Sequence, residues 1–520
     1  MLIKKIIIDD KELYFSEKYN KEIIKEENFF TIIIGKNASG KSNALKELCH
    51  LLIRAQIKDD FESIYVDRLD HYLDRNYKDI LHRGEDNFYS EINFKNNDEI
   101  FTYNYIRTNE ERIFINYLGN PEFIKDKVFR HIFGMRQGRL LKVKYPEKIN
   151  IIAVSSGQFD KFPVLQSMGL SSSTGIKYSY VGVQNDKLSS HYDSVLSLKV
   201  GEIGHAIIKL SVESKNINIK NLLHTLGFSN KVTIKYEVNR SSISRHSIDN
   251  EKLLIHGNEF SSIGLGDEEN TLKGNDFNLV KKSLSYFSKR HDLIESDYGY
   301  IDLDLFGKNN SIEEKHLYYA AKVNALKIRD VYFEEENGIS SLSLASSGQI
   351  NLLNIFFGIA SCIEDNSLVL IDEPEISLHA DWQMQFIPLI REAFSQYKGC
   401  HYIIATHAPL IISKVCSDNS SILNMTTGET VSSKVFNNQS ADYINSHLFE
   451  TPGPKNETMN REVVSLLSAI SKRKKLSRID LEKSKDLIYL ADKLLEGDPI
   501  KDLVSILEEA LGLLKVDKND

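Results

Sequence analysis

The octapeptide GKNASGKS at residues 35–42 contains the residue types that hold a triphosphate. It matches G-x-x-x-x-G-K-[ST], it follows the apolar run FFTIII, and the sequence behind it has helical spacing, which is the context that a phosphate loop needs. Glycines let backbone N–H groups face phosphate oxygens, the lysine reaches the β and γ phosphates, and the serine hydroxyl holds Mg²⁺. We therefore expect ATP and Mg²⁺ to bind here, with contacts from Gly35, Asn37, Gly40, Lys41, Ser42 and Asn43.

A second chemical group lies in SLVLIDEPEISLH, residues 367–379, where an apolar run ends in two adjacent carboxylates. Adjacent acids at the end of a buried strand repel each other unless a cation lies nearby. We expect Asp372 to orient Mg²⁺ together with Ser42, and Glu373 to polarise the attacking water. His407 follows another apolar run, HYIIAT, and is a third catalytic candidate because it also lies at a strand end.

Four apolar runs must position these groups. Their hydrophobicity is continuous rather than alternating, which is typical of strands buried on both faces of a parallel sheet, and ligands bind beyond the carboxyl ends of such strands. The runs occupy residues 29–34, 149–154, 367–371 and 401–406.

The other parts of the chain have different patterns. Residues 87–117 alternate between apolar and polar positions and predict antiparallel β structure. We expect an α/β fold with four parts: a first ATPase lobe with this β elaboration (1–185), a mostly helical insertion (186–335), a second ATPase lobe (336–430) and a C-terminal helical region (431–520).

The composition is that of an ordinary globular protein. A net charge of −8 and a pI of about 6.1 give no general electrostatic reason to bind nucleic acid or membrane. No segment approaches the roughly 18 apolar residues of a membrane span, and the N-terminus becomes acidic too early for a signal peptide. The four cysteines are scattered and form no C-x-x-C pair, so we expect a cytoplasmic protein without disulfides.

The stretch LASSGQINLL, residues 344–353, places a polar turn directly before an apolar helical pattern. With the phosphate loop, the acidic strand end and the histidine, it resembles the signature of ABC-type ATPases, the P-loop NTPases of the ATP-binding-cassette class. That resemblance implies a head-to-tail dimer in which Ser346, Gly348 and Gln349 of one copy face the nucleotide held by the other. SSGQ here replaces the more usual SGGQ, and His379 stands where transporters usually have aspartate.

The resemblance also implies a glutamine that contacts the magnesium and the attacking water. Gln158 in IIAVSSGQFDKF follows the second apolar run, where the family places this glutamine. Gln184 in YSYVGVQND is the competing candidate. We prefer Gln158, both as a Mg²⁺ contact and as a catalytic residue.

DEPEISLHADWQ is typical of soluble cassette ATPases of the RecF-, SMC- and OLD-like groups. With SGQFDKFP and SADYINSHLFETPGPKNETMNREV, it resembles the PtuA-type ATPases of Septu and retron-associated antiphage systems. This resemblance implies an HNH nuclease partner of the PtuB type. It is also compatible with a retron reverse transcriptase and its msDNA as further partners. The alternatives are a RecF- or SMC-like DNA-binding ATPase of repair or maintenance, and a protein that holds ATP without turnover.

Two other features could carry chemistry. Asp302 and Asp304 in YIDLDLF are spaced like a metal-binding pair, but their period of two favours one polar face of an exposed strand. The basic segments 127–148 and 471–478 could hold nucleic-acid phosphates, although acidic neighbours favour solvated helix faces.

Overall fold

The computed structural model describes most of the chain, but several of the predicted site residues lie outside the described ranges. The described ranges are 2–8, 11–15, 27–36, 39–55, 88–96, 99–107, 112–118, 149–157, 162–163, 177–182, 194–213, 217–239, 247–248, 252–255, 258–261, 275–290, 298–307, 311–336, 338–415, 419–473 and 476–513. Asn37, Gln158, Gln184 and the basic segment 127–148 therefore lie outside the described residues. Within the described part, no helix is long and apolar enough to span a membrane.

A seven-stranded sheet forms the centre of the molecule in the order β19-β18-β3-β17-β16-β7-β8, and only the edge strand β19 is antiparallel to its neighbour. Strands β3, β7, β16 and β17 are buried along their whole length, which confirms the four predicted parallel strands. The bounds are β3 Phe29–Ile34, β7 Ile151–Ser155, β8 Tyr178–Val181, β16 Leu368–Asp372, β17 His401–Ala405, β18 Ser420–Asn424 and β19 Thr430–Ser432.

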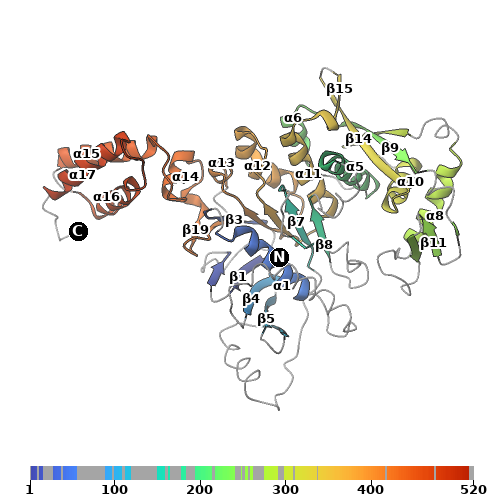
Figure 1. The fold of residues 1–520 in the computed structure, drawn as a ribbon, viewed down its shortest axis with the longest axis horizontal. Coiled ribbons are helices and arrows are strands. Elements are labelled where there is room, and N and C mark those ends of the chain that lie inside the picture. The colour runs from blue at the N-terminus through green and yellow to red at the C-terminus, as the bar shows by residue number, and fades with distance from the viewer. Residues whose placement is uncertain are drawn as a thin grey trace, which may run out of the picture.

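Both faces of the sheet are covered (Figure 1). Helices α11, α12 and α13 lie over one face, and one large apolar core joins α11 and α12 to alternate residues of β3 such as Ile32. Helix α1 lies under the other face, where a second core contains Ile33 of the same strand. The bounds are α1 Lys41–Ala55, α11 Ser347–Cys362, α12 Ala380–Ala393 and α13 Pro409–Ile412.

A five-stranded antiparallel sheet lies on the α1 side, in the order β2-β1-β4-β5-β6. Its strands β4, β5 and β6 confirm the antiparallel structure predicted around residues 87–117. The bounds are β1 Leu2–Ile8, β2 Lys11–Tyr14, β4 Phe88–Asn96, β5 Glu99–Arg107 and β6 Arg112–Leu118.

The expectation of a mostly helical insertion over 186–335 is wrong, because the region also contains a sheet. Strands β13, β9, β14 and β15 form a four-stranded antiparallel sheet in that order, and the period-two alternation of segments such as KVTIKYEV is a local signal for strands in this region. The predicted limit at 335/336 falls in the β14–β15 turn. The bounds are α5 Val195–Glu213, α6 Lys220–Leu226, β9 Lys231–Val238, β10 Ser247–Ile248, β11 Lys252–Ile255, β12 Asn258–Ser261, α8 Asn275–Ser288, β13 Tyr298–Asp304, α10 Ile312–Lys322, β14 Leu326–Glu335 and β15 Gly338–Ser341.

The C-terminal helices form a small unit at one end of the molecule (Figure 1). Helices α15, α16 and α17 share a hydrophobic core of their own, as their apolar spacing predicts. The bounds are α14 Ala441–His447, α15 Glu457–Arg473, α16 Arg478–Ala491 and α17 Pro499–Gly512.

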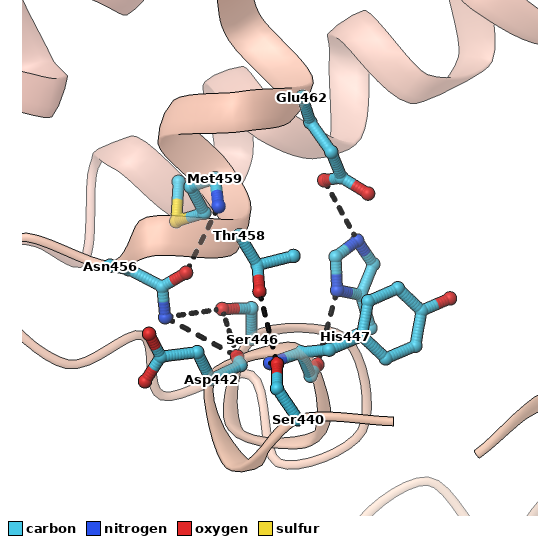
Figure 2. A network of polar contacts seen from close by, with 9 residues as sticks. Ser440, Asp442, Ser446, His447, Asn456, Thr458, Met459 and Glu462 are labelled. Atoms are coloured by element: carbon cyan, nitrogen blue, oxygen red, sulfur yellow. Dashed lines mark hydrogen bonds and ion pairs between the residues drawn. The ribbon is translucent and has the colours of Figure 1, made fainter. Parts of the chain in front are cut away.

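A polar network joins α14 to the start of α15 (Figure 2). The buried Asn456 donates to Ser446 Oγ at 2.9 Å and to the Asp442 carbonyl at 3.3 Å, while its Oδ1 accepts from the Met459 N–H at 3.0 Å. His447 Nε2 lies 3.3 Å from Glu462 Oε2. This α14–α15 joint connects the C-terminal unit to the ATPase core.

Candidate functional site

The predicted chemical groups meet at one edge of the central sheet, because its strands are parallel and in register. Asp372 at the end of β16 pairs with Ala405 of β17, which in turn pairs with Ile33 of β3. The phosphate loop follows β3 directly, and Ser42 Oγ donates a hydrogen bond to Asp372 Oδ1 at 3.1 Å. The two residues predicted to share Mg²⁺ are therefore adjacent, although they are far apart in the sequence.

The phosphate loop has the backbone that its glycines permit. Gly40 has a φ of +92°, a conformation that residues with side chains rarely adopt, and a Cβ on Gly35 would lie 2.4 Å from Ser39 Oγ. Lys41 Nζ donates to the Gly35 carbonyl at 3.0 Å. Burial lowers the pKa of Lys41, whereas the nearby carboxylates raise it. Ser39 Oγ is shielded from solvent and has no hydrogen-bond partner among the described residues.

The chemistry of the donor groups fits Mg²⁺. Burial raises the pKa of Asp372 to about 7, and the carboxylates of Glu373 and Glu375 add to this rise, while Ser42 and Lys41 oppose it. A cation would favour the ionised carboxylate, and Mg²⁺ prefers oxygen ligands such as the Ser42 hydroxyl and the Asp372 carboxylate. When bound with ATP, Mg²⁺ would neutralise charge on the phosphates. These ligand roles remain predictions.

Glu373 and His407 lie together at the same sheet edge. His407 Nε2 is 3.0 Å from Glu373 Oε1, and about a third of each side chain is exposed. Glu373 has a φ of +49°, and its N–H donates to the Ala405 carbonyl at 2.9 Å. A non-glycine residue in this region costs on the order of 1–3 kcal/mol, and such strain is concentrated at functional sites. The geometry is compatible with a carboxylate held ready to orient water.

Sequence reasoning missed a third carboxylate, Glu375. Its Oε1 accepts a hydrogen bond from the His407 N–H at 2.8 Å, and burial raises its pKa. Its Oε2 is buried and has no partner among the described residues. Its position as the second glutamate of DEPE, close behind Asp372 and Glu373, was the sequence signal that could have placed it in the site. Glu375 thus holds the backbone at His407, the predicted catalytic histidine.

The signature residues begin helix α11. Ser346 is its N-cap: Ser346 Oγ accepts from the Gln349 N–H at 3.2 Å, and Gln349 Oε1 accepts from the Ser346 N–H at 2.9 Å. Gln349 Nε2 also donates to the Leu226 carbonyl at 3.4 Å. Both amide atoms of Gln349 thus have protein partners here, and its contact with nucleotide remains a prediction. Ser346 and Ser347 are exposed, so the helix N-terminus faces outward.

Gly348 lies against the turn that follows the acidic strand. A Cβ at this position would lie 2.5 Å from the Ser377 carbonyl and 2.8 Å from the ring of Trp382, so only glycine fits. Sequence reasoning missed Asn351, one turn further along α11. Its amide donates to Ser156 Oγ at 3.1 Å and to the Ile376 carbonyl at 3.0 Å. These contacts join the signature helix to the ends of β7 and β16.

A protein-family model described as AAA ATPase domain matches residues 7–412 of this chain, which include the whole site. No curated protein matches the chain. Among solved structures, the SMC head domain from Thermotoga maritima is 12% identical, with 83% of this chain and 98% of that chain covered and a TM-score of 0.29. The Smc head domain with an extended coiled coil bound to the C-terminal domain of ScpA, derived from Pyrococcus furiosus, is 11% identical, with 84% and 97% covered and a TM-score of 0.31.

Proposed function

The chain belongs to the AAA ATPase domain family and is a P-loop ATPase, and we propose that it dimerises around ATP and Mg²⁺ to regulate a partner nuclease in antiphage defence. The family membership implies nucleotide binding. The dimer, the partner and the biological role are the proposal, and the resemblance to PtuA-type ATPases supports the last two.

The observation that carries the proposal is the outward-facing signature. Lys41, Ser42, Asp372 and Glu373 lie close together at the sheet edge, where we propose that phosphate and magnesium bind, whereas Ser346 and Ser347 begin α11 with exposed side chains. A helix N-terminus favours anions, because its N–H groups and its dipole point at them. A second copy, packed head to tail, would bring this N-terminus to the γ-phosphate. ATP that contacts two copies at once favours the dimer by mass action.

In the proposed cycle, Lys41 binds the phosphates and Ser42 with Asp372 holds Mg²⁺. Glu373 orients the attacking water, with His407 3.0 Å away to hold the carboxylate in place. Closure of the dimer excludes bulk water from these groups. The partner nuclease is held in the closed state and released when ATP falls, because ATP favours only the closed state.

Reconstitution with the proposed partner tests this function. The HNH nuclease is copurified with the native chain, and DNA cleavage is measured at saturating ATP and after ATP is removed by apyrase. With the native chain, we expect DNA cleavage only after ATP is removed. With Lys41→Ala, we expect DNA cleavage already at saturating ATP. A nuclease that neither copurifies nor responds to ATP would contradict the proposal.

The alternative is a RecF- or SMC-like ATPase that binds DNA itself. The described part of the second basic segment includes Lys472, near the end of α15, and Arg478, at the start of α16. Salt-dependent DNA binding by the isolated chain, lost on neutralising both basic segments, would favour this alternative.

A further inference from the structure

Asp330 is a buried carboxylate in the insertion, and its hydrogen bonds converge on the turn that precedes the signature. It lies on β14 and is 9% exposed. Its Oδ2 accepts from Ser341 Oγ at 2.6 Å. Its Oδ1 accepts from the Ser343 N–H at 3.2 Å and from Ser343 Oγ at 3.0 Å, besides a local bond from the Val331 N–H at 2.8 Å.

The turn held by Asp330 leads directly to the signature. A short 3₁₀ helix, η5 (Leu342–Leu344), follows Ser341, and the Ala345 N–H bonds back to the Leu342 carbonyl at 3.1 Å. Ser346 is the next residue and caps α11. Three bonds from one carboxylate to Ser341 and Ser343 therefore fix the chain within a few residues of the predicted phosphate contact.

The turn has other contacts besides those with Asp330: Ser341 pairs with Tyr332 in the β14–β15 ladder, and η5 packs on β14 and α5. Leu342 is buried and anchors one side, but Leu344 is 86% exposed and fixes nothing on the other. Behind the turn, α5 packs on both α11 and β14, which makes the insertion a rigid support for the signature helix. A buried, fully hydrogen-bonded carboxylate is costly to disturb, because removing it leaves several donors without a partner.

We propose that Asp330 is a positioning residue that sets where the signature of one copy meets the nucleotide of the other. This inference rests on the proposed function, because it requires that the signature acts on a second copy. Asp330 does not touch the nucleotide. It acts through Ser341 and Ser343, and a displacement of about 1 Å at a reacting group can reduce turnover about a hundredfold.

The first test compares Asp330→Ala with a matched control on the same sheet. Asp302 is exposed and accepts a hydrogen bond from Thr233 Oγ1 at 2.6 Å, far from the signature turn in sequence, so Asp302→Ala is the control. We expect Asp330→Ala to lower kcat for ATP hydrolysis about tenfold to a hundredfold. Binding of a fluorescent ATP analogue to the isolated chain should be unchanged, since the Lys41 half of the site is not altered.

The conservative variant sharpens this test. In Asp330→Asn the remaining carbonyl oxygen can accept from Ser343, and the amide can donate to Ser341 Oγ, so the turn keeps its geometry. We expect kcat within about threefold of the native chain. A requirement for charge rather than for hydrogen bonds would make Asn as damaging as Ala, and would overturn the positioning role.

Mixed dimers separate positioning in trans from damage to the chain's own site. Lys41→Ala removes the phosphate contact but keeps an intact signature. Asp330→Ala keeps the phosphate contact of Lys41 but displaces the signature. Mixing these two impaired chains should restore hydrolysis at one of the two sites. Ser347→Glu with Lys41→Ala is the reference pair, because a glutamate at the exposed first turn of α11 repels the γ-phosphate without destabilising the helix.

The outcomes are distinct. Restoration in both pairs supports the inference. Restoration in the reference pair alone means that Asp330 does not act through the signature, and a kcat for Asp330→Ala within twofold of the native chain overturns the inference as well. No restoration in the reference pair contradicts the shared site itself. Should Asp330→Ala fail to fold, Ser343→Ala, which removes one of the same bonds, takes its place in the mixed dimers with the same interpretation.

Discussion

The two halves of the candidate nucleotide site are built in different ways. The phosphate half is internally bonded: Ser42 contacts Asp372, Glu373 contacts His407, and Lys41 contacts the Gly35 carbonyl. In the signature half, Gln349 bonds to the Leu226 carbonyl and the preceding turn bonds to Asp330, while Ser346 and Ser347 face solvent. The comparison teaches that the phosphate half is preformed by contacts within itself, whereas the signature half is supported by the protein on one side and exposed on the other.

The largest expected effect concerns the preformed half. Glu373→Gln should lower hydrolysis about 10²- to 10⁴-fold, because the amide cannot act as the base for the attacking water. ATP binding should persist, since Lys41 and Ser42 are unchanged. Phosphate release under single-turnover conditions measures this. Equal rates for the native and Gln chains would show that Glu373 is not the catalytic base, and no phosphate release from either chain would show that ATP is held without turnover.

Gly348→Ala tests the support of the signature half. The new Cβ would meet the Ser377 carbonyl at 2.5 Å, so α11 or the turn must shift, at a cost of about 1–3 kcal/mol. We expect a lower midpoint of thermal unfolding and about a tenfold loss of kcat. Gly512→Ala is the control, because a Cβ there meets nothing within 4 Å. Equal unfolding midpoints and equal kcat values for the two variants would show that close packing at Gly348 does not support the signature.

Asp372→Asn should separate stability from function in the preformed half. Burial raises the pKa of Asp372 to about 7, above its ordinary value, so the folded chain holds this proton more tightly than the unfolded chain. Ionisation of Asp372 therefore costs stability, which falls as pH rises from about 4 to about 7 and then levels off. The neutral Asn should stabilise the nucleotide-free chain at pH 8, on the order of 2 kcal/mol, although hydrolysis is lost.

The pH profile of that variant is the check. The stabilisation of Asp372→Asn over the native chain should shrink as pH falls from 8 to 5, because native Asp372 then becomes protonated in the folded state. Thermal unfolding at each pH, without nucleotide, measures it. A stabilisation that is constant with pH, or a destabilised variant, would contradict the account of this carboxylate.

The smallest expected effect on turnover concerns the α14–α15 joint, which lies outside both halves. Asn456→Ala removes its bonds to Ser446, Asp442 and Met459 at a cost of about 1–3 kcal/mol. Hydrogen exchange should increase in α15 to α17, while kcat stays within about twofold. Thr458→Ala, which loses only a 3.3 Å contact with Ser440, is the control. A large loss of kcat would show that the joint is coupled to the site.

The sequence was most informative where local patterns determine structure. Continuous apolar runs predicted the four parallel strands, and the glycine-rich octapeptide predicted the loop that places Ser42 beside Asp372. These signals are local, because burial on both faces and phosphate binding each constrain a few consecutive residues.

The contacts that sequence reasoning missed join distant segments. Asn351 bonds to Ser156, and Asp330 bonds to Ser341 across the β14–β15 hairpin, but a single asparagine or aspartate in an apolar context gives no indication of its partner. The sheet of the insertion was also missed as a sheet. Alternation can predict the individual strands, but β9, β13 and β14 are far apart in the sequence, so their pairing depends on tertiary packing.

The central claim, a site shared between two copies, is tested most directly by the mass of the Glu373→Gln chain in solution with and without ATP and Mg²⁺. Mass photometry should show the 59.5 kDa chain doubling in mass only when both are present, and Ser347→Glu in the same background should abolish this change. A Glu373→Gln chain that binds ATP and Mg²⁺ yet keeps the same mass would contradict the account.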